Sequence, residues 1–81
     1  MDNKSEIREL LRRLLTEKGD SQPLNDDSSL LLSGRLNSVD SIEIVIFLEE
    51  KHGIDFAEIG FDQEQIDSVE AIEALIRATG H

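Results

Sequence analysis

The sequence predicts an all-α fold: a small bundle of three main helices plus a short fourth, with a long loop between the first and second helices. Apolar residues recur at helical spacing in three separate segments. Each of these segments is bounded by residues that typically cap or end helices, and a stretch rich in Ser, Asn, Asp and Gly separates the first from the second. The length of 81 residues allows one modest core, so we assign residues 1–81 to a single domain.

The first helix should run from about Ser5 to Lys18, with Ser5 or Asn3 as its cap and Gly19 as its end. Its apolar face follows the i, i+3, i+4, i+7, i+8 spacing and consists of Ile7, Leu10, Leu11, Leu14 and Leu15.

Residues 19–36 read as a long connection that contains Pro23. The triplet Leu30-Leu31-Leu32 is expected to attach this loop to the core. A loop of this length in a small domain is often functional.

The second helix should run from about Ser38 to His52, with Asn37 as the N-cap and Gly53 as the stop. At about 100° per residue, one side of the helix carries the core residues Ser41, Ile44, Val45 and Leu48. The opposite side carries Val39, Glu43, Ile46 and Glu50. A stripe that mixes aliphatic residues with carboxylates is poorly suited to a core and well suited to docking.

The third helix should be short and lie between Phe56 and Gln65. The last helix should run from about Ser68 to Ala78, capped by Ser68 or Asp67 and ended by Gly80. Its inner face consists of Val69, Ile72, Leu75 and Ile76.

The charge of the chain excludes several classes of partner. Eight basic residues stand against 18 acidic ones, for a net charge of −10, and residues 36–81 alone carry −9. Nucleic acid and anionic membrane surfaces both require basic surfaces, so we expect neither as a partner. Proteins with basic patches are the expected partners.

No arrangement of residues in the sequence indicates catalysis. The two histidines, His52 and His81, are far apart, so they build neither a metal site nor a catalytic triad. There is no cysteine, and the acidic residues lack the spacing of a calcium-binding loop. We therefore expect no enzyme activity and no bound metal. Because the start of the sequence lacks an apolar signal segment, we expect a cytoplasmic protein.

Ser38 stands where the loop meets the second helix, a position that favours an anionic group. No base lies near it in sequence, so we interpret it as a serine that another enzyme modifies. The run from Ser38 through Glu43-Ile44-Val45 to Leu48-Glu49-Glu50 and Gly53 resembles the acyl/peptidyl carrier protein family. The segment Phe61–Ile72 is also similar to the approach to the last helix in many stand-alone carriers.

The resemblance implies that Ser38 receives 4′-phosphopantetheine from coenzyme A, through a phosphopantetheinyl transferase that uses Mg²⁺. By residue identity alone, Asp40-Ser41 and Asp67-Ser68 match the family's Asp-Ser pair better than Asn37-Ser38 does. Ser38 is nevertheless favoured, because only from Ser38 do the Glu-aliphatic-Val and Leu-Glu-Glu units fall at the family's spacing. Asn37 departs from the usual aspartate of the family, which puts recognition by a standard transferase in question.

The resemblance also implies further partners, namely an acyl- or aminoacyl-loading ligase and downstream biosynthetic enzymes with basic docking patches. The expected docking residues are Asn37, Val39, Asp40, Glu43, Ile46, Glu49 and Glu50. We expect a monomer. The sequence does not identify the acyl or aminoacyl cargo, and it does not distinguish a fatty-acid, polyketide or specialised pathway. The alternative function is a cofactor-free acidic adaptor or inhibitor that docks through the surface of the second helix.

Overall fold

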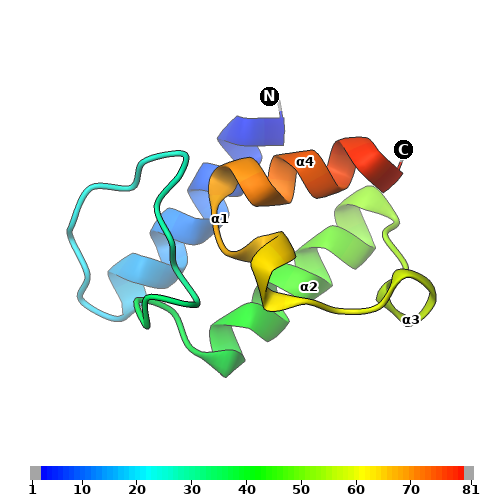
Figure 1. Ribbon diagram of the computed structural model, residues 1–81. Coiled ribbons are helices and arrows are strands. Elements are labelled where there is room, and N and C mark those ends of the chain that lie inside the picture. Colours follow the sequence, from blue (N-terminus) through cyan, green and yellow to red (C-terminus); the bar gives the residue numbers. More distant parts are fainter. Residues whose placement is uncertain (1–2, 80–81) are drawn as a thin grey trace.

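The computed structural model describes residues 3–79, and within them the chain is helical and has no strand. The elements follow in the order α1 (Asn3–Glu17), α2 (Ser38–His52), α3 (Phe56–Ile59), the 3₁₀ helix η1 (Gln63–Ile66) and α4 (Val69–Thr79). Figure 1 shows the long loop between α1 and α2 and the short α3 that follows α2. The predicted small all-α bundle is confirmed.

The core lies between the three long helices and the loop. Each long helix contributes its predicted apolar face, and the loop and η1 add further aliphatic residues. The residues that are at most 3 % exposed are Ile7, Leu11, Leu14, Leu15, Leu30, Leu36, Ile44, Leu48, Ile54, Ile66, Val69, Ile72 and Ile76. Burial of apolar area on this scale is the main term that stabilises a domain of this size.

Helix α1 begins two residues earlier and ends one residue earlier than predicted. Asn3 and Ser5, the two predicted caps, both lie inside the helix. The predicted end is correct: Gly19 has a positive φ of 80°, and the following Asp20 N–H donates to the Leu15 carbonyl over 2.9 Å. This is the usual way in which a glycine closes the last turn of a helix.

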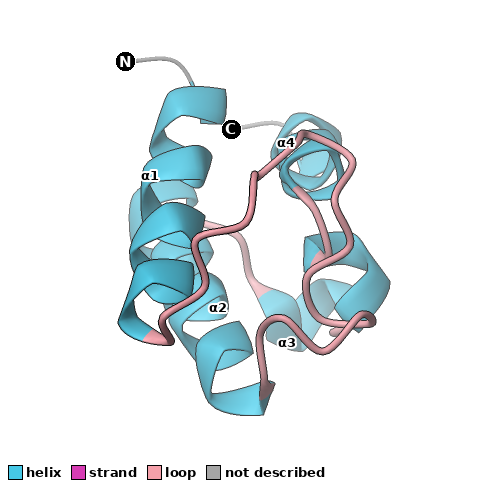
Figure 2. Cartoon of the chain, turned by 90° about the vertical axis from the view of Figure 1, so that its left-hand side faces the viewer, coloured by secondary structure: helices cyan, strands magenta, loops and turns pink. Residues whose placement is uncertain are grey.

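The long loop is attached to the bundle by Leu30 and Leu36, which are buried. The prediction that the whole leucine triplet would anchor the loop is wrong at Leu32, which is 60 % exposed. The carboxylate of Asp67 holds the backbone of this triplet. One of its oxygens, Oδ1, accepts the backbone N–H groups of all three leucines, at 3.2, 2.7 and 2.8 Å from Leu30, Leu31 and Leu32. Figure 2 shows the loop passing close to the start of α4, where the Glu70 N–H donates to the Asp26 carbonyl over 2.9 Å.

The last third of the chain uses short side chains as caps. Asp55 accepts the Ala57 N–H at the start of α3, and Ser68 accepts the Ala71 N–H at the start of α4, over 3.0 and 3.1 Å. Ser68 is therefore the cap of α4, and Asp67 instead holds the loop. Helix α4 begins and ends one residue later than predicted. Gly80, its predicted end, lies outside the described residues.

Candidate functional site

Ser38 is the first residue of α2, and its side chain is exposed at the corner where the loop enters the helix. Among residues 3–79, nothing forms a hydrogen bond with the Ser38 hydroxyl. Helix geometry also leaves the N–H groups of Ser38 and Val39 without partners inside α2. A free hydroxyl and free N–H groups therefore lie together at the positive end of the helix dipole, which favours an anionic group.

A reciprocal capping box fixes this corner. The Asp40 N–H donates to Asn37 Oδ1 over 3.1 Å, and the Asn37 N–H donates to Asp40 Oδ2 over 3.0 Å. Lys18, just after α1, lies 2.9 Å from the same Asp40 oxygen. The start of α2 is thus connected both to its own cap and to the end of α1.

Arg35 holds the chain on the other side of Ser38. Its guanidinium forms a two-pronged pair with Asp20, at 3.0 and 3.3 Å, and also donates to the carbonyls of Gln22 and Pro23. The hydrogen bond from Arg35, followed by that from the Gln22 N–H, lowers the pKa of Asp20. This pair ties the segment before Ser38 to the beginning of the long loop, a contact that periodicity in the sequence does not reveal.

The two competing serines are engaged elsewhere. Ser41 is only 6 % exposed, and its hydroxyl donates to the Ser38 carbonyl over 2.6 Å. Ser68 caps α4. Of these three serines, Ser38 alone presents its hydroxyl at the surface without a hydrogen-bond partner among the described residues.

All of the predicted docking residues except Asp40 are exposed. Val39, Glu43, Ile46 and Glu50 are all exposed and lie along one side of α2; we call these four residues the α2 stripe. Glu49 and the cap Asn37 are exposed as well. Asp40 differs, because its side chain is only 13 % exposed and is committed to Lys18 and the capping box.

Sequence reasoning missed Ile42 as a surface residue, although it is 57 % exposed. Together with Ser41, Val45, Phe56 and Phe61 it lines an apolar pocket of about 210 Å³ between α2 and the α3 region. The signal was present in the spacing, because Ile42 follows Val39 by three residues and precedes Ile46 by four, which places it beside the α2 stripe.

No protein-family model matches the chain, and comparison with curated proteins and with solved structures finds no significant match. None of the described helices is long and apolar enough to cross a bilayer. In residues 3–79, no three His, Asp or Glu side chains come together in a way that could hold a metal ion.

Proposed function

We propose that the chain is a carrier protein whose Ser38 bears 4′-phosphopantetheine and presents acyl or aminoacyl thioesters to partner enzymes. The observation that carries this proposal is the exposed Ser38 hydroxyl, free of hydrogen bonds to described residues, at the capped start of α2. The spacing from Ser38 to Leu48-Glu49-Glu50, which resembles the acyl/peptidyl carrier family, supports the same assignment.

The residues at this corner fit a phosphodiester. The Ser38 oxygen would give up its proton to the transferase and form the new bond to phosphorus, while the bond between the two phosphates of coenzyme A breaks and adenosine 3′,5′-bisphosphate leaves. The N–H groups of Ser38 and Val39, which have no partner inside α2, would donate hydrogen bonds to the phosphate oxygens near the helix start. When attached, the group supplies a terminal thiol that carries cargo as a thioester.

In this proposal the chain itself catalyses no reaction and works in the cytoplasm as a monomer. The tethered cargo would reach each partner enzyme at high effective concentration. The partners are a phosphopantetheinyl transferase, a loading ligase and downstream biosynthetic enzymes. The exposed carboxylates of the α2 stripe support docking by basic surfaces, because they are oriented to solvent and not used in the core.

Mass spectrometry after incubation with coenzyme A, Mg²⁺ and a broad-specificity transferase tests the proposal. We expect a gain of one phosphopantetheine on the wild-type chain and none on Ser38→Ala. Ser41→Ala and Ser68→Ala should still be modified, provided that circular dichroism shows them folded. Modification mapped to Ser68 would overturn the site. No gain on any folded variant would favour the cofactor-free adaptor instead.

A further inference from the structure

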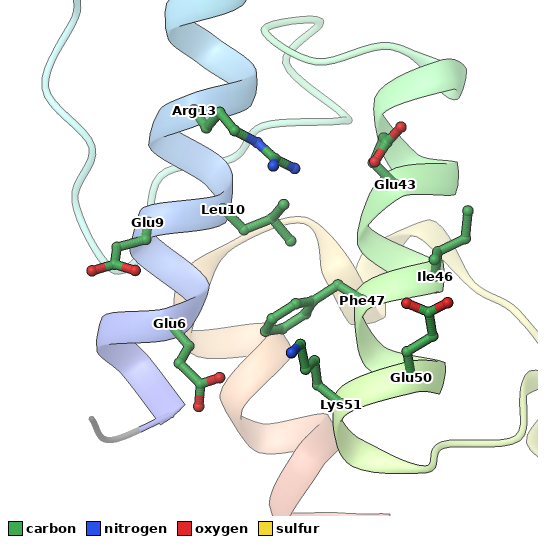
Figure 3. A pocket seen from close by; sticks show the side chains of 9 residues that line it. All are labelled: Glu6, Glu9, Leu10, Arg13, Glu43, Ile46, Phe47, Glu50 and Lys51. Atoms are coloured by element: carbon green, nitrogen blue, oxygen red, sulfur yellow. The ribbon is translucent and has the colours of Figure 1, made fainter.

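A groove of about 470 Å³ runs along the seam between α1 and α2 (Figure 3). It is distinct from the apolar pocket between α2 and the α3 region, because it lies on the side of α2 that faces α1. Its lining residues come from both helices: Glu6, Glu9, Leu10, Arg13, Glu43, Ile46, Phe47, Glu50 and Lys51.

The floor of the groove is apolar. In Figure 3 the side chains of Leu10 and Phe47 extend toward one another from the two helices. Both are partly buried and pack against the core. Ile46, at the edge of the groove, is 43 % exposed. The groove thus offers an apolar strip that the fold itself leaves uncovered.

The walls of the groove carry charges that the fold does not use. None of its six charged residues forms an ion pair within 4.0 Å in the described part of the chain. By contrast, Asp20, Asp26 and Asp40 are all paired with basic side chains. Four glutamates against one arginine and one lysine give the groove an excess of negative charge.

We propose that this groove binds an amphipathic helix of a partner protein, with an apolar face flanked by Lys and Arg. The apolar face would lie on Leu10 and Phe47, and the basic residues would approach Glu6, Glu43 and Glu50. A second copy of this chain is a poor occupant, because each chain has a net charge of −10. The inference rests on the docking role proposed above for the α2 stripe, and it does not require Ser38 to be modified.

The test uses a synthetic amphipathic helix of leucine and lysine, about 14 residues long so that it spans the groove at ~1.5 Å per residue. It is titrated into ¹⁵N-labelled unmodified protein and followed by NMR. The largest amide shifts should map to residues 6–13 of α1 and 43–51 of α2. Because half-exposed and exposed charges such as Glu6 and Glu50 contribute modestly, Glu6→Lys and Glu50→Lys should each weaken binding by about two- to tenfold.

Matched variants outside the groove serve as controls. Glu58→Lys and Glu70→Lys make the same charge change at exposed positions. Ile46→Ala removes apolar contact area at the edge of the groove and should also weaken binding, and Ile59→Ala is its control because both isoleucines are 43 % exposed. The controls should bind nearly as wild type, and a leucine–glutamate peptide should not bind. Shifts centred on the apolar pocket at Ile42 and Phe61 would overturn the inference, as would equal losses in groove and control variants. Ser38 modification is measured separately, so either proposal can fail without the other.

Discussion

Asn37, the residue before Ser38, caps α2 and lies next to the proposed modification site. Asn37 caps α2 through its side-chain oxygen, and an aspartate can do the same because the two residues cap helices about equally well. Lys18 beside Asp40 would offset the added carboxylate. We therefore expect Asn37→Asp to keep the melting temperature within a few degrees and to preserve or speed modification by a standard transferase.

Thermal unfolding and the initial rate of modification check this prediction. Asn37→Ala is the control: it removes the cap, which costs about 1 kcal/mol and should lower the melting temperature by about 4–8 °C. A comparable loss in Asn37→Asp would contradict the capping argument.

Asp67 makes the stability of the fold depend on pH. Partial burial raises the pKa of this carboxyl, but the Ser29 hydroxyl and the N–H groups of residues 30–32 outweigh burial and lower the pKa below 3.8. A lowered pKa in the folded state means that the stabilisation is present above the unfolded value and is lost as the pH falls through the folded value. Asp67→Asn should therefore reduce the free energy of unfolding at pH 7 by about 1–2 kcal/mol, through weaker acceptance of these N–H groups.

Denaturant unfolding should be measured from pH 7 downward. The difference in free energy of unfolding between wild type and Asp67→Asn should narrow as the pH falls below 3.8, the unperturbed pKa of an aspartate. Asp27→Asn, at an exposed position in the same loop, is the charge-matched control and should change stability little at any of these pH values. If this difference in free energy of unfolding stayed constant down to pH 2, the stability lost in Asp67→Asn would not come from the charge of Asp67.

Among the elements, the sequence predicts best where its signals are local. Both bounds of α2 are correct because Asn37 and Gly53 act on their own helix. Leu32 could not be placed in the same way, because the backbone of its triplet is held by Asp67, which lies 35 residues away. The pairing of Arg35 with Asp20 and the groove between α1 and α2 likewise arise from packing between segments, which no periodicity encodes. At the site, exposure of the α2 stripe was predictable from helical spacing, whereas the commitment of Asp40 to Lys18 was not.

The α2 stripe should affect association with a partner in two separable ways. Glu43→Lys should slow modification by the transferase mainly through association, and the effect should shrink as salt rises, because exposed charges are screened over roughly 8–10 Å. Ile46→Ala should weaken binding at all salt concentrations, since its contribution is apolar. Rates measured at low and high salt distinguish the two, with Glu58→Lys as the charge control. If the transferase modified Glu43→Lys at the wild-type rate at low salt, the docking surface would have to lie elsewhere.

For the whole molecule, charge is distributed unevenly along the chain. Residues 36–81, which include Ser38, carry a net charge of −9, whereas residues 1–35 carry −1. The basic side chains of the first half are largely used within the fold: Lys4 and Arg8 pair with Asp26, and Arg35 pairs with Asp20. The remaining field is strongly negative, which steers a basic partner toward the molecule but also destabilises the folded state by self-repulsion.

This self-repulsion predicts how salt changes stability. Raising NaCl from ~10 mM to ~300 mM shortens the screening length, so it should weaken repulsion among the acidic residues and raise the melting temperature. Glu50→Gln removes one unpaired negative charge and should raise the melting temperature at low salt by about 1–3 °C, with a smaller salt response. Arg13→Gln removes an unpaired positive charge from the facing wall of the same groove and should shift the melting temperature the opposite way. Differential scanning calorimetry at both salt concentrations measures all three proteins. If salt lowered the wild-type melting temperature, the attraction within the ion pairs of Asp20, Asp26 and Asp40 would outweigh the net repulsion, and the prediction would be wrong.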